Sequence, residues 1–149
     1  ILARQIIVAT GAHERPIFFA DNDRPGIMLA GAARTYLNRY GVLVGRQVVV
    51  FTANDSAYAA AVELAAAGAR VQLVDARPAP GSGLLAAAAA AGVSVRTAAV
   101  VIGTTGAADS DGRVCDVQVA GFDCGVTGAA GAASSLLAQM MPRRSTCEP

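Results

Sequence analysis

The segment TANDSA, which begins at Thr52, stands where a strand should give way to a helix, and its residue types bear on nucleotide binding. A dinucleotide-binding turn normally reads G-x-G-x-x-G/A, because glycines let the backbone bend tightly and approach the pyrophosphate at the helix start. Thr52 and Asn54 occupy the first two glycine positions here, and only Ala57 is an accepted substitute. With Asn54 in a left-handed bend, the N–H groups up to Ser56 could still bind phosphate, although Asp55 would repel it.

A second acidic residue, Asp75, ends the next predicted strand, 21 residues after Asn54. An acid at that distance can accept a hydrogen bond from a ribose 2′-hydroxyl, and Arg77 leaves a 2′-phosphate conceivable. The alternative is that Asp75 only caps a strand and Asp55 only caps a helix. Both interpretations stay open, because a motif that departs this far from its pattern is a weak signal.

A further candidate contact lies near the start of the chain. Thr10 and Gly11 end a short apolar run over Gln5 to Ala9, and a glycine there would let the backbone approach a cofactor closely. His13, the only histidine, could transfer a proton. The sequence names no partner for it, so a loop histidine bonded to its neighbours is the favoured interpretation. No catalytic residue is assigned.

The elements that must position these residues follow from hydrophobic patterning. Apolar β-rich runs alternate with alanine-rich helical runs, an order typical of parallel sheets. We therefore predict an α/β protein, an incomplete Rossmann-like βαβαβ dinucleotide-binding fold followed by an antiparallel β-meander. The predicted strands are residues 46–51, 70–75 and 93–97, the helices are 56–68 and 84–91, and the meander includes 100–102 and 113–119.

The composition is that of one globular unit, with 149 residues, 54% of them hydrophobic, and a net charge of +1. The arginines are not clustered, which argues against nucleic-acid binding. An odd number of cysteines without a C-x-x-C motif indicates free thiols of a reducing compartment and no metal site; these are Cys115, Cys124 and Cys147. Apolar runs fall short of the roughly 20 residues of a membrane span, so a cytoplasmic protein with no membrane contact is expected.

Three longer segments carry a resemblance to a known family: ATGAHERP, FADNDRPGIMLAGAARTYLNRYGV and FTANDSAYAAAVELAAAGA. Together they resemble the α subunits of heterotetrameric sarcosine oxidases, over about residues 1–120. Opine and proline dehydrogenase subunits and hydrogen cyanide synthase subunits share the ATGA turn and a PG linker. The combination of NDRPG with YLNRYG favours the sarcosine enzyme.

The resemblance implies a subunit of a complex that oxidatively demethylates sarcosine to glycine and formaldehyde with formation of hydrogen peroxide. It implies NAD in the α subunit, FAD in the β subunit and FMN at their interface, with γ and δ subunits, an amine substrate and folate as further partners. Sarcosine oxidation belongs to the β subunit, so this chain is expected to hold no complete catalytic centre. The alternatives are a related amine, opine or proline dehydrogenase subunit, or a non-catalytic scaffold module.

The resemblance also implies a division of the chain. Residues 1–15 would end a truncated first dinucleotide-binding domain, 16–45 form a linker with a helix over Leu29 to Tyr40, 46–120 form a second NAD(P)-binding-like domain, and 121–149 form an aberrant or disordered tail. The Gln5 to Ala9 strand should then lie at an edge or against the linker helix. In the tail we expect no strand and at most a short helix at 134–141, as a frameshift would produce.

Overall fold

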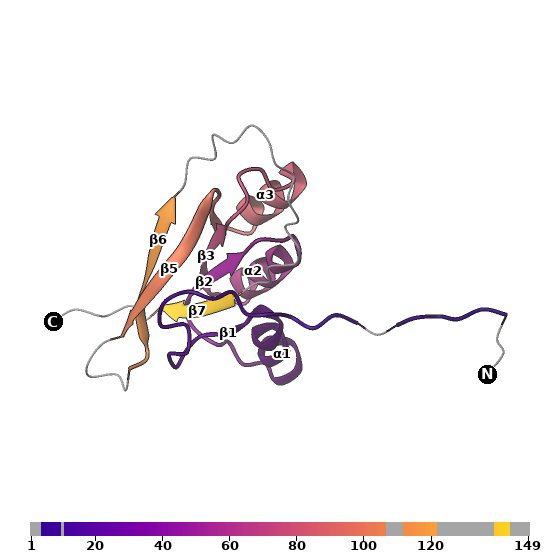
Figure 1. Ribbon diagram of the computed structural model, residues 1–149, viewed down its shortest axis with the longest axis horizontal. Coiled ribbons are helices and arrows are strands. Elements are labelled where there is room, and N and C mark those ends of the chain that lie inside the picture. Colours follow the sequence, from indigo (N-terminus) through magenta and orange to yellow (C-terminus); the bar gives the residue numbers. More distant parts are fainter. Residues whose placement is uncertain (1–3, 10, 107–111, 122–138, 144–149) are drawn as a thin grey trace.

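The computed structural model describes residues 4–9, 11–106, 112–121 and 139–143. Its elements are β1 (Met28–Leu29), α1 (Ala30–Tyr40), β2 (Gln47–Thr52), α2 (Ser56–Ala66), β3 (Arg70–Asp75), α3 (Ser82–Ala90), β4 (Ser94–Arg96), β5 (Ala99–Gly106), β6 (Val114–Gly121) and β7 (Gln139–Arg143). Figure 1 shows the three helices on one side of the central strands and the β5–β6 hairpin on the other.

The central sheet has the strand order β1-β7-β2-β3-β4. Strands β2, β3 and β4 are parallel, and α2 and α3 connect them, so the predicted β-α-β-α-β order is confirmed. The protein is thus α/β, with three parallel strands and an antiparallel hairpin. The predicted meander is, within the described residues, this single hairpin of β5 and β6, which forms a sheet of its own.

Strands β2 and β3 are covered on both faces, as their continuous apolar sequences predict. Val48 and Val50 of β2 belong to the core cluster shared with α1, α2 and α3. Val49 and Phe51 alternate with them and join the cluster on the hairpin side. Because successive side chains of a strand point to opposite faces, one six-residue strand contributes to two separate cores.

Helix α1 agrees with the predicted helix: it ends at Tyr40, and Gly41, with a φ of 64°, forms the expected left-handed cap. Its start is held by a residue that the sequence did not single out. The Glu14 carboxylate accepts hydrogen bonds from the backbone N–H of Ala30, at 3.0 Å, and of Gly31, at 2.7 Å. An acid at this end of a helix satisfies otherwise free N–H groups and favours the helix dipole.

A Cβ atom at position 31 would lie 2.6 Å from the Glu14 carboxylate, so a side chain there would force the Glu14 side chain to move. Gly83 is also the second residue of its helix, but a Cβ there meets nothing within 4 Å. We expect Gly83→Ala to stabilise the protein by up to about 1 kcal/mol through helix propensity. Gly31→Ala should be less favourable than Gly83→Ala by about 1.5–3 kcal/mol, since it displaces hydrogen bonds to a charged group. Urea unfolding of the two variants would measure this difference, and equal effects would contradict the Glu14 contact.

Two predictions about the ends of the chain are wrong. Residues 5–9 form no strand: Ile6 is 80% exposed and Ile7 is 92% exposed, and Figure 1 shows the segment extending away from the body. An apolar run forms a strand only where a neighbouring strand accepts its hydrogen bonds, and the described residues supply none there.

The second correction concerns the C-terminal region. Strand β7 lies between β1 and β2 and is antiparallel to both. Residues 139–141, which were predicted to belong to a short helix at most, are therefore part of a strand. Residues 139–143 are therefore part of the sheet and not of an unstructured tail. The rest of the predicted tail, from residue 122 on, lies outside the described residues.

Candidate functional site

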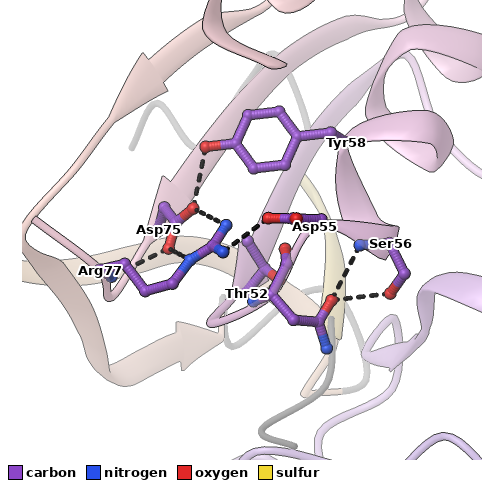
Figure 2. A network of polar contacts seen from close by, with 7 residues as sticks. Thr52, Asp55, Ser56, Tyr58, Asp75 and Arg77 are labelled. Carbon is purple, nitrogen blue, oxygen red and sulfur yellow. Dashed lines mark hydrogen bonds and ion pairs between the residues drawn. The ribbon is translucent and has the colours of Figure 1, made fainter. Parts of the chain in front are cut away.

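The polar residues singled out in the sequence meet at the carboxyl end of the parallel strands. Thr52 ends β2, Asp75 ends β3, and the two residues are direct partners in the parallel register. Helix α2 begins at Ser56, after a turn of residues 53–55. Asn54 and Asp75 are 21 residues apart in the sequence, and the intervening βαβ unit brings them to the same edge of the sheet. Figure 2 shows the resulting cluster.

Side-chain hydrogen bonds hold the glycine-poor turn. The Thr52 hydroxyl accepts a bond from the Asn54 N–H and donates one to the Asn54 carbonyl, each at 3.0 Å. Asn54 Oδ1 in turn accepts bonds from the Ser56 N–H, at 3.0 Å, and the Ser56 hydroxyl, at 2.7 Å. Such bonds from short polar side chains replace the backbone freedom that glycines would supply.

Two details of the sequence interpretation are corrected by this geometry. The described non-glycine residues with positive φ are Asp21 and Ala98, so Asn54 does not form a left-handed bend and acts through its side chain instead. Asp55 has helical backbone angles and makes no side-chain cap bond. The side chain of Asn54, and not that of Asp55, satisfies the first N–H group of α2.

Asp75 is fully buried, and each of its two carboxylate oxygens accepts two hydrogen bonds. Oδ2 binds the Tyr58 hydroxyl and Arg77 Nη2, each at 2.8 Å. Oδ1 binds the backbone N–H of Arg77 at 2.9 Å and Arg77 Nε at 3.1 Å. A buried carboxylate is stable only when a cation and hydrogen bonds compensate it, and Arg77 grips this one with two guanidinium nitrogens.

Arg77 also connects the buried acid to the surface. Its Nη1 lies 2.6 Å from Asp55 Oδ1, and the Asp55 side chain is 68% exposed. One guanidinium therefore ties the end of β3 to the start of α2. The hydrogen bond with Asp75 raises the pKa of Arg77, so the guanidinium of Arg77 stays protonated and positively charged under ordinary conditions.

Tyr58, on the first turn of α2, is a member of this cluster that the sequence pattern did not reveal. Burial, followed by its hydrogen bond to the Asp75 carboxylate, raises the pKa of its phenol well above the usual value. The folded state therefore favours the neutral phenol, and this contribution to stability is complete below about pH 10 and is lost as pH rises through the folded pKa. In the sequence, nothing distinguishes Tyr58 from an aromatic residue that only packs in the core.

The remaining predicted contacts lie apart from this cluster. Thr10 falls outside the described residues. Gly11 is exposed and has a φ of 68°, a conformation that favours glycine whatever the space around it. His13 is exposed and lines a cleft of about 250 Å³ together with Glu14, Arg34 and Ser56. The structure thus brings His13 to the start of α2 and does not bring it to Asp75.

Among the residues described, no group of three or more His, Cys, Asp or Glu is placed to hold a metal ion. Cys115 is buried and its thiol lies 3.6 Å from the Arg113 carbonyl oxygen, and the other two cysteines lie outside the described ranges. Within the same residues no helix is long and apolar enough to span a membrane.

The fold and the cluster define an α/β protein in which polar side chains from two parallel strands and the following helix meet at one edge of the sheet. No family model matches the sequence. Three curated relatives do, and all are named sarcosine oxidase subunit alpha. The protein of Corynebacterium sp. strain P-1 is 54% identical over 120 residues, or 80% of this chain, and that of strain U-96 is 51% identical over 126 residues, or 83%.

The third relative, from Rhizobium meliloti strain 1021, is 57% identical over 82 residues, which is 54% of this chain. The resemblance to sarcosine oxidase α subunits is therefore confirmed. The chain spans only about 12% of the length of the two Corynebacterium proteins. The function for which those proteins are named therefore belongs to a much longer polypeptide than this chain.

Proposed function

We propose that this chain is the second, Rossmann-like dinucleotide-fold module of a sarcosine oxidase-type α subunit. The observation that carries the proposal is the identity of 54% over four-fifths of the chain with a protein named for that subunit. The βαβαβ order of β2 to β4 agrees with it, because open parallel sheets of this kind form the halves of dinucleotide-binding folds. In general terms, the proposed function is that of part of an oxidoreductase subunit.

The parent complex then oxidises the N-methyl group of sarcosine. Sarcosine, water and O₂ yield glycine, formaldehyde and hydrogen peroxide: the two electrons lost by the CH–NH group of sarcosine pass through flavin to O₂, and water cleaves the resulting imine. In this proposal FAD belongs to the β subunit, FMN to the interface, and NAD to the α subunit, with γ and δ subunits and folate completing a cytoplasmic complex. No residue of this chain is assigned to the reacting atoms.

A peroxide assay tests the reaction class. The subunit containing this chain would be assembled with its partner subunits and supplied with sarcosine and air. We expect one hydrogen peroxide per formaldehyde formed, a signal removed by catalase, and none with glycine as the control substrate. Formaldehyde release that requires an artificial electron acceptor, without peroxide, would instead identify a dehydrogenase of the amine, opine or proline type.

A non-catalytic scaffold is the second candidate, and one observation favours it. The groups of Asp75 and Arg77 that a bound nucleotide would contact are engaged with each other in the folded chain. A module of this kind contributes rigid surfaces to an assembly and needs no ligand of its own.

A further inference from the structure

A dinucleotide on a fold of this type makes two main contacts at the carboxyl edge of the sheet. Its pyrophosphate lies on free N–H groups at the start of the helix after the first strand, here α2. Its ribose hydroxyl donates to an acid at the end of the second strand, here Asp75.

The first N–H group at the helix start is already bonded to a protein side chain. Asn54 Oδ1 lies 3.0 Å from the Ser56 N–H and takes the position that a phosphate oxygen would need. The carboxylate of Asp55 adjoins the same turn. Two like charges about 4 Å apart repel by about 1 kcal/mol in water and by several times that near a protein surface, so Asp55 disfavours an incoming phosphate by the part of its charge that Arg77 does not offset.

The acid at the end of β3 is equally engaged. A carboxylate offers about four lone-pair positions, and Asp75 uses four in bonds to Tyr58 and Arg77. A ribose hydroxyl could bind only by displacing one of these donors. Because Asp75 is fully buried, loss of its cation would leave a charge without compensation.

The cleft beside the helix start is also acidic on its other wall. Glu14 lines it and holds the N–H groups of Ala30 and Gly31, which would otherwise offer a second anion-binding helix end. Arg34 lines the cleft as well, but its guanidinium donates to Glu63 on α2. The one arginine that lines this cleft is thus paired within the described part of the protein.

We propose that the nucleotide-facing edge of this fold is closed by its own side chains, with Asn54, Arg77 and Glu14 holding the contacts that a dinucleotide would take. The module fastens its helices and strands together at this edge and binds no NAD. The residues therefore do not fit the NAD that the proposed function gives to the α subunit, and that NAD is bound by another part of the polypeptide. The inference rests on the proposed function only in its test, which measures NAD binding by the full-length subunit.

Two variants with opposite charge changes test the closed edge. Asn54→Asp adds a negative charge at the phosphate position and keeps the oxygen that caps α2, and Asp55→Asn removes a charge from the same turn. Both would be made in the full-length subunit within its complex, with Asp23→Asn, an exposed acid of the 21–25 turn, as the control. NAD affinity would be measured by titration, together with the NAD released on denaturation.

A closed edge predicts that all three variants keep the wild-type NAD affinity and content within about twofold. If NAD lies on this turn, Asn54→Asp should weaken its binding by tenfold or more and Asp55→Asn should strengthen it. Opposite shifts of this kind would overturn the inference. A complex that binds no NAD in any form would contradict the proposed cofactor while agreeing with the closed edge.

Discussion

Replacing Asp75 with alanine is expected to lower the free energy of unfolding by about 3–5 kcal/mol. Asp75 is fully buried, and its removal leaves the Tyr58 hydroxyl and the Arg77 guanidinium without their shared acceptor. Arg77 would keep Asp55 as a partner and is 30% exposed, so the cost comes mainly from the several hydrogen bonds that the buried carboxylate accepts, each worth about 1.5–3 kcal/mol. Urea unfolding of the chain, followed by circular dichroism, would measure the change.

The matched control is Asp55→Ala, which removes the other acid bound to Arg77. Its side chain is 68% exposed, so water replaces the lost contact and the expected cost is about 0–1 kcal/mol. A difference of several kcal/mol between the two aspartates is therefore expected. Similar costs at both positions would show that Asp75 is not the compensated buried acid described here.

The second large effect is expected for Phe51→Ala, at about 3–5 kcal/mol. Phe51 is 3% exposed and lies in the core between the central sheet and the hairpin. Its ring meets that of Phe19 edge to face, with 6.3 Å between ring centroids and 61° between the planes. Truncation loses the burial of a large ring and leaves a cavity that the two sheets cannot fully close.

Phe18→Ala supplies the control for this prediction, since it makes the same substitution next to Phe19. Phe18 is 84% exposed, and the change should alter the free energy of unfolding by no more than about 0.5 kcal/mol. The melting temperature of the two variants gives a second measure. Comparable losses in both would contradict the assignment of Phe51 to a core on the hairpin side.

The parallel part of the fold could be predicted from the sequence because local patterns specify it. The runs RQVVVF and RVQLVD are apolar without alternation, and the structure has strands at Gln47–Thr52 and Arg70–Asp75. The alanine-rich run between them forms α2, and Gly68 follows its end with a φ of 95°. Composition, period and turn residues act over a few positions, so they can be read along the chain.

The two ends could not be predicted in the same way. Residues 5–9 have the composition of a buried strand and yet lie exposed, whereas β7 has no β-rich pattern and yet lies between two strands. Whether a segment becomes a strand depends on the presence of an unpaired neighbour at the right distance. The unpaired edge of β2 supplies one to β7, and no described strand supplies one to residues 5–9.

At the site, the sequence alone determined that the turn beginning at Thr52 and the strand end at Asp75 would lie at the same edge of neighbouring parallel strands, because one βαβ unit of this length brings them together. Only the tertiary structure decided what the side chains do there. It turned Arg77 back onto Asp75, added Tyr58 from the next helix, and placed Glu14 at the start of α1. The physical reason is that a hydrogen bond depends on distances and directions between side chains, which spacing along the chain does not specify.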